Sequence, residues 1–174
     1  MEEKKMTWKD VVPSSIAGVL TIAMVVLTVI YYYNEAGLNW LLYIGWAIWA
    51  VGFLLTMTPA AVLRKKGDVP EGKSWVKTTV VVNSGPYALV RHPIYVGWML
   101  MLFALILISQ HWITAILGIV AMAIFYPDIP KEDRSNVEKF GDAYKKYQQS
   151  VPMINLPLGV IRLLRRKKGV KKYG

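Results

Sequence analysis

The sequence predicts an all-α integral membrane protein with about four transmembrane helices. First, 55% of its 174 residues are hydrophobic and 18% are charged, whereas charged residues make up roughly a quarter of a typical soluble domain. Second, four apolar runs of helical length contain no charged residue. Third, the 21 Lys and Arg residues alternate between the segments that connect these runs. We therefore interpret residues 1–174 as one membrane domain.

The four apolar runs predict helices at about 12–33, 38–63, 93–109 and 112–127. The first two contain the roughly 20 residues that a bilayer core requires. The first run is longer than the apolar region of a signal peptide, roughly 7–15 residues, so we expect it to be retained. Only Gln110 and His111 separate the last two runs, which predicts a tight antiparallel hairpin.

The distribution of basic residues predicts the orientation. Six Lys or Arg residues lie in 64–92 and twelve in 128–174, but none lies in 34–39 or 109–111. Short loops rich in Lys and Arg remain on the cytoplasmic side. We therefore expect a multi-pass protein with both termini in the cytoplasm.

Two cytoplasmic segments, 78–95 and 128–157, are predicted to accompany the membrane helices. The β-branched run at 78–82, followed by a Gly-Pro turn, predicts a short extended segment. Pro130 and the acids after it favour a helix that starts at Asp128 and ends near Ser150. An apolar stripe makes this helix amphipathic; it consists of Val137, Phe140, Tyr144 and Tyr147.

The C-terminal segment 158–174 is a basic tail without an acidic residue. One interpretation is a tail that aids solubility and fixes topology. The alternative is a tail that binds anionic lipid headgroups, at about 1 kcal/mol per basic residue near the surface. Nucleic-acid binding is not indicated, because membrane topology alone would place the basic residues on one face.

The chemistry of the chain is not that of a common soluble enzyme. No dinucleotide-binding, P-loop or serine-hydrolase motif is present, and the absence of cysteine excludes thiolate chemistry. Two histidines make a metal site improbable. One stretch differs, because Arg91 and His92, flanked by Tyr87 and Tyr95, stand at the mouth of a predicted membrane helix. Polar groups there are costly and usually face protein or a cavity; simple interfacial anchoring is the alternative.

This stretch resembles a signature of the isoprenylcysteine carboxyl methyltransferases, whose relatives include membrane phospholipid and thiol methyltransferases. Residues 85–97 follow the pattern G-P-Y-x-x-V-R-H-P-x-Y-x-G. Residues 132–152 are similar to the family pattern E-E-x6-F-G-x-x-Y-x-x-Y-x3-V-P. The resemblance covers roughly residues 78–157.

The resemblance implies a methyltransferase that uses S-adenosyl-L-methionine without a Rossmann fold. It implies that Glu132 holds the methionine ammonium of the cofactor, and it makes Arg91 and His92 the candidate catalytic residues. We interpret Tyr144 and Tyr147 as packing residues. The cofactor-binding residues implied by the family are Val80, Val81, Val82, Tyr87, His92, Pro93, Ile94, Tyr95 and Glu132.

Two departures from the family pattern leave the acceptor open. Asp128 stands where many prenylcysteine enzymes have an arginine that meets the substrate carboxylate, and Thr79 stands where a histidine is common. Asp128 is therefore the candidate substrate-binding residue, and its charge favours a neutral or cationic acceptor, or else a carboxylate acceptor that Arg91 or an arginine of the tail binds instead. The acceptor could be a prenylcysteine-like carboxylate, a lipid or a small apolar compound. Alternatives are a phospholipid amine or thiol methyltransferase, a non-catalytic membrane adaptor on a degenerate scaffold, and a lipid-binding scaffold.

Overall fold

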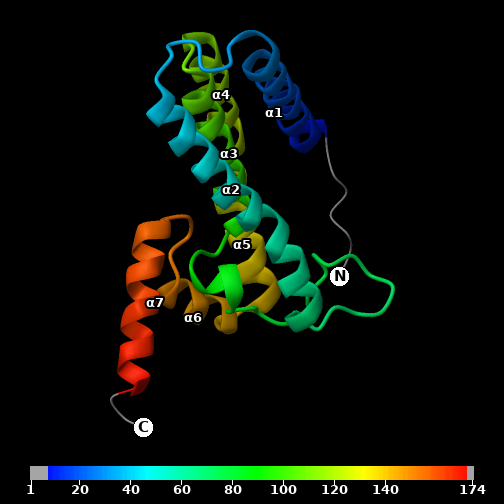
Figure 1. Ribbon diagram of the computed structural model, residues 1–174. Coiled ribbons are helices and arrows are strands. Elements are labelled where there is room, and N and C mark those ends of the chain that lie inside the picture. The colour runs from blue at the N-terminus through cyan, green and yellow to red at the C-terminus, as the bar shows by residue number, and fades with distance from the viewer. Residues whose placement is uncertain (1–7, 172–174) are drawn as a thin grey trace. The chain divides into compact units, whose positions relative to one another are not determined.

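The computed structural model describes residues 8–171, whose regular secondary structure is helical throughout and includes no strand (Figure 1). The all-α prediction is therefore confirmed for this part of the chain. Its elements in order are α1 (Trp8–Val26), the π turn η1 (Leu27–Tyr31), α2 (Asn39–Lys66), the 3-10 turn η2 (Gly85–Ala88), α3 (Pro93–Ser109), α4 (Trp112–Phe125), α5 (Asp128–Phe140), α6 (Asp142–Ser150) and α7 (Leu156–Lys171).

The apolar runs locate α2, α3 and α4 closely, whereas the helix predicted at about 12–33 begins at Trp8, and its last part is the π turn η1. The structure begins and ends α3 at the predicted residues, and α4 ends two residues before the predicted position. The apolar run at 38–63 continues as helix α2 to Lys66. Basic side chains in a last helical turn interact favourably with the helix dipole, so the charges end the apolar run without ending the helix.

Two stretches are long and apolar enough to cross a membrane, Asn39–Lys66 and Trp112–Phe140. The apolar part of the second stretch is α4, because the charged residues of α5 follow it. Two shorter apolar helices cover Ser15–Tyr31 and Pro93–Ser109. Many large apolar side chains face outward, among them Val29 and Ile30 of η1 and Tyr43 of α2, which supports the membrane character. The count of four spans and the orientation stay predictions.

The chain divides into two compact units, and the boundaries fall within α2, α3 and α5. The first unit comprises residues up to Val51 and Met99–Pro130. In it, α1 packs on α4, and the buried core contains Met24, Leu102, Leu105 and Ala121. Small residues permit close helix packing: a Cβ on Gly118 would lie 2.9 Å from Cε of Met24.

The α3–α4 turn of the first unit is fastened by polar groups. Gln110 adopts a φ of +57°, and its Nε2 donates to Oδ1 of Asn34 at 2.7 Å and to the carbonyl of Leu38 at 2.9 Å. His111 caps α4, because its Nδ1 accepts from the backbone N–H of Ile113 at 3.2 Å. The ring of His111 also stacks on Tyr32 with centroids 3.7 Å apart.

The second unit comprises Gly52–Trp98 and residues from Lys131 onward. A Cβ on Gly97 of α3 would lie 2.6 Å from the carbonyl oxygen of Gly52 in α2, so the two helices meet closely there. Residues 78–84 form neither helix nor strand. They are tied down at Thr79, whose N–H donates to the carbonyl of Gly67 at 2.9 Å.

One prediction for residues 128–150 is corrected by the structure. The single helix predicted from Asp128 to Ser150 is two helices, α5 and α6. The break lies at Gly141, whose φ of +59° is one that residues with a side chain rarely adopt. Most of the basic tail, for which the sequence predicts no particular secondary structure, forms α7 as far as Lys171.

Candidate functional site

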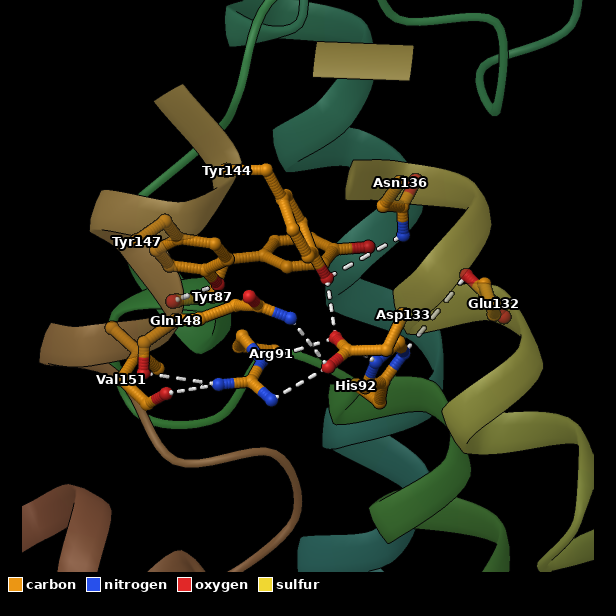
Figure 2. A network of polar contacts seen from close by, with 10 residues as sticks. All are labelled: Tyr87, Arg91, His92, Glu132, Asp133, Asn136, Tyr144, Tyr147, Gln148 and Val151. Carbon is orange, nitrogen blue, oxygen red and sulfur yellow. Dashed lines mark hydrogen bonds and ion pairs between the residues drawn. The ribbon is translucent and has the colours of Figure 1, made fainter. Parts of the chain in front are cut away.

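The two motifs of the sequence meet at one buried carboxylate, that of Asp133 (Figure 2). Arg91 Nε donates to its Oδ1 at 3.1 Å, and Nη2 donates to its Oδ2 at 2.7 Å. This two-pronged geometry is the strong form of an arginine–carboxylate pair. The side chains of Arg91 and Asp133 are only 10% and 11% exposed, so the pair is shielded from water.

His92 binds the same carboxylate and also faces its neighbour. Its Nε2 lies 2.9 Å from Oδ1 of Asp133, and its Nδ1 lies 4.0 Å from Oε1 of Glu132. The backbone N–H groups of Arg91 and His92 donate to the carbonyls of Pro152 and Met153. The segment after α6 therefore fixes the position from which both side chains extend.

Two further donors from α6 complete the environment of Asp133. The hydroxyl of Tyr144 donates to Oδ1 and Nε2 of Gln148 donates to Oδ2, both at 2.8 Å. Burial raises the pKa of Asp133, but the hydrogen bonds from Tyr144, Arg91 and His92 outweigh it, so this pKa lies below its ordinary value. The same burial and the adjacent carboxylate raise the pKa of Tyr144. Asp133 is therefore a charged and fully engaged acceptor.

Arg91 has further partners besides Asp133. Its Nη1 donates to the carbonyls of Gln148 at 3.1 Å and Val151 at 2.9 Å. Gln148 lies in the last turn of α6 and Val151 is its C-cap, where backbone carbonyls lack helical partners. Arg91 was predicted as catalytic, and its contacts in the structure are those of a residue that joins the two motifs.

Glu132 has the opposite surroundings, because its side chain is 50% exposed. Tyr87 lies near it: burial first, and then the charge of Glu132, raise the pKa of the Tyr87 phenol. The backbone of Tyr87 is anchored by Tyr147, whose hydroxyl donates to the Tyr87 carbonyl at 2.6 Å. Burial also raises the pKa of Tyr147. Tyr144 and Tyr147 thus pack as predicted and in addition supply hydroxyl donors.

The remaining predicted cofactor residues adjoin this network or lie in the segment before it. Pro93, Ile94 and Tyr95 form the first turn of α3, and the Tyr95 ring lies edge-on to His92 with centroids 5.9 Å apart. Val81 packs on the cluster of Tyr144, Tyr147 and Val151. Val82 is buried, and Val80 is exposed.

Asp128, the predicted substrate residue, opens α5 and belongs to the first unit, whereas the network lies within the second. Among the described residues 8–171, no group of three or more His, Cys, Asp or Glu side chains could hold a metal ion.

Sequence reasoning gave no role to Asp133 and Gln148. Asp133 was interpreted only as an acid in an early helical turn. A stronger signal was available, because an arginine that is buried at a helix mouth needs a counter-charge, and Asp133 is one of only eleven acidic residues. No sequence signal marks Gln148, because its approach to Asp133 depends on the break between α5 and α6.

Comparisons with known proteins confirm the resemblance noted in the sequence. Residues 73–138 match the model of the isoprenylcysteine carboxyl methyltransferase (ICMT) family. Over 112 residues the chain is 30% identical to the protein-S-isoprenylcysteine O-methyltransferase of Schizosaccharomyces pombe, covering 59% of this chain and 46% of that protein. The match thus spans about half the length of the curated relative. No solved structure matches the chain significantly.

Proposed function

We propose that this chain is an integral-membrane, S-adenosyl-L-methionine-dependent methyltransferase of the isoprenylcysteine carboxyl methyltransferase type. The match at residues 73–138 supports the class. The observation that carries the proposal is the contrast between two adjacent carboxylates. Asp133 is saturated by protein donors, whereas Glu132 is half exposed beside His92 and Tyr87. Glu132 is therefore suited to bind a cation from outside the protein.

The side chains around Glu132 fit the chemistry of the cofactor. A half-exposed carboxylate suits an ammonium group, and the aromatic rings of Tyr87 and Tyr95 suit an apolar or cationic neighbour. We propose that Glu132, Tyr87, His92 and the first turn of α3 hold the cofactor, together with the segment 80–82. When bound, S-adenosyl-L-methionine supplies a methyl group on a positively charged sulfur; transfer to a carboxylate oxygen breaks the methyl–sulfur bond and leaves a methyl ester and a thioether.

The contribution of the protein to such a reaction is mainly positioning and exclusion of water. The Arg91–Asp133 pair joins η2 and α3 to α5 and α6. Tyr147 anchors the η2 turn at Tyr87. These bonds fix the residues around Glu132 before any ligand arrives, which reduces the cost of ordering them on binding.

The acceptor that we propose is membrane-partitioned, with a prenylcysteine-like carboxylate first among the candidates. This follows from the family match and from the name of the yeast relative. A phospholipid amine or a thiol is the second candidate, because Asp128 stands where many prenylcysteine enzymes have an arginine that meets the substrate carboxylate.

The direct test is methyl transfer by the full chain in lipid nanodiscs. We expect label from the methyl group of S-adenosyl-L-methionine to reach a prenylcysteine analogue. Label on phosphatidylethanolamine or a lipophilic thiol instead would replace the first acceptor with the second. Label on none of them, together with no binding of the cofactor, would contradict the proposed function and favour an adaptor on a degenerate scaffold.

We also propose the multi-pass topology with both termini in the cytoplasm. Because the chain lacks cysteine, single cysteines report their own side of the membrane. A cysteine at Lys73 should resist an impermeant thiol reagent in intact cells, and the matched control at Glu35 should react. Labelling of the Lys73 site from outside would overturn this orientation.

A further inference from the structure

The tautomer of His92 follows from the surroundings of Asp133. An ionised carboxylate only accepts hydrogen bonds. Arg91, Tyr144 and Gln148 all donate to it, so the Nε2 of His92, at 2.9 Å from Oδ1, must donate as well. In a neutral imidazole the other nitrogen, Nδ1, then carries a lone pair and is an acceptor.

Nδ1 of His92 and Oε1 of Glu132 form a second acceptor pair. Their separation of 4.0 Å is too long for a direct hydrogen bond, so each remains available to a donor. An ammonium has three donors and forms charge-assisted bonds of about 2.7–2.9 Å. One ammonium can therefore bond to two acceptors at this separation. Figure 2 shows His92 between the two carboxylates.

We propose that Asp133 is a positioning residue that holds His92 with its proton on Nε2, so that Nδ1 and the Glu132 carboxylate together accept from an ammonium. The proposal rests on the proposed function, because the ammonium belongs to the cofactor. Asp133 also keeps Arg91 bound through both of its oxygens. The Arg91 guanidinium is therefore not available to Glu132. Among the described residues, no Lys or Arg side chain is bonded to the Glu132 carboxylate.

The test is the ¹⁵N spectrum of histidine-labelled protein in nanodiscs, without ligand. The chain has two histidines, and His111→Asn assigns the signals while retaining a good helix cap. We expect wild-type His92 to show a protonated Nε2 and an unprotonated Nδ1. In Asp133→Asn the uncharged amide can donate or accept, so the second tautomer should appear. Tyr144→Phe, which keeps the charge of Asp133, should retain the wild-type tautomer.

Binding of S-adenosyl-L-homocysteine, which retains the ammonium, provides the second readout. We expect Asp133→Asn to weaken it at least fivefold. If that variant does not fold, Arg91→Gln with Asp133→Asn removes both charges together and is expected to give the same two results. The proposal would be overturned if Asp133→Asn kept the wild-type tautomer of His92 and an unchanged dissociation constant. It would also be overturned if neutral His92 in the wild type carried its proton on Nδ1. Failure of the wild type to bind this ligand would contradict the proposed function, whereas the ligand-free spectra still decide the role of Asp133.

A different observation, the outer face of α7, supports a second inference. The inner face of α7 packs tightly: a Cβ on Gly159 would clash with the backbone carbonyl of Leu89. The outer face is apolar and exposed, with Val160 at 41%, Ile161 at 47% and Leu164 at 55%. These residues share one side of the helix by their spacing. The sequence then continues with four basic residues from Arg165 to Lys168 and no acid.

We infer that this face of α7 docks on an anionic bilayer surface. Amphipathic helices with apolar side chains beside basic ones lie in the headgroup region, and their binding depends on anionic lipid. The charge of α7 is complementary to such a surface. The occupant is therefore a lipid surface rather than a second apolar protein face.

Single cysteines test this contact in nanodiscs that contain doxyl-labelled lipid. A fluorophore on Leu164→Cys should be quenched at least twofold more with phosphatidylglycerol present than in phosphatidylcholine alone, and high salt should reverse the difference. The same label on Lys146→Cys in α6 serves as the matched control. Absence of lipid quenching at Leu164 would overturn the inference, as would equal quenching in both lipids. Self-quenching that rises with protein concentration would assign the face to a second copy instead.

Discussion

The two units of the molecule are stabilised in different ways. In the first, apolar side chains and small residues bring α1, α3 and α4 together around Met24 and Leu102. In the second, one carboxylate binds donors from the segment between η2 and α3 and from α6. Apolar packing tolerates small changes in shape, whereas a buried ion pair is strongly destabilising when one partner is removed. Substitutions at Asp133 and its partners should therefore lower the free energy of unfolding more than substitutions in the core of the first unit.

The largest effect is expected at Asp133. Asp133→Ala leaves Arg91 buried without its counter-charge, at a cost of about 3–5 kcal/mol. Thermal unfolding in detergent should show a large drop in midpoint. The control is Asp142→Ala, whose ion pair with Lys145 lies on the surface, and its midpoint should not change. Equal midpoints for the two variants would mean that the Asp133 network does not hold the second unit together.

A smaller loss is expected at Gly159. Gly159→Ala forces a Cβ into the carbonyl of Leu89, and overpacking of this kind costs about 1–3 kcal/mol. Gly18→Ala in α1 is the matched change in the first unit. No atom lies within 4 Å of the added Cβ there, so helix propensity should make it neutral or slightly stabilising. An unfolding midpoint of Gly159→Ala that is not lower than that of Gly18→Ala would contradict the close packing of α7.

Acid titration separates Asp133 from ordinary carboxyl groups. Its pKa is lower in the folded state than the ordinary value of about 3.9. A depressed folded pKa contributes stability above the unfolded pKa, and this stability is lost as the pH falls through the folded pKa. The unfolding free energy of the wild type should therefore decline below about pH 4, and it should decline less in Arg91→Gln with Asp133→Asn. Parallel curves would show that Asp133 is not the group responsible.

The sequence could predict most of the helices but not the network of hydrogen bonds around Asp133. The uncharged runs located α2, α3 and α4, because apolar composition and length determine such helices whatever their partners. The motif residues Arg91, His92 and Glu132 were also identified from the sequence. Their pairing was not, because the contact between Arg91 and Asp133 crosses 42 positions of the chain. The break at Gly141 was missed because the apolar stripe continues through it, and its φ is a property of the fold.

The smallest effect is expected at Tyr147. Tyr147→Phe removes the hydrogen bond to the Tyr87 carbonyl and should cost about 0.5–1.5 kcal/mol. Tyr43→Phe, at an exposed site of the first unit, should cost nothing measurable. Because the bond anchors the turn that bears Tyr87, ligand binding should also weaken slightly in Tyr147→Phe. A midpoint equal to that of Tyr43→Phe would show that the bond contributes little.

The central claim is that Glu132, rather than its neighbour, is the carboxylate that receives the cofactor. Calorimetric titration of the full chain with S-adenosyl-L-homocysteine tests it most directly, using Glu132→Gln and the control Glu138→Gln, which is exposed on the same helix. Loss of a charge-assisted bond is worth roughly 1.5–3 kcal/mol. We predict a dissociation constant raised about tenfold or more in Glu132→Gln, with an unchanged unfolding midpoint and wild-type binding in the control. Wild-type binding in Glu132→Gln would contradict the account.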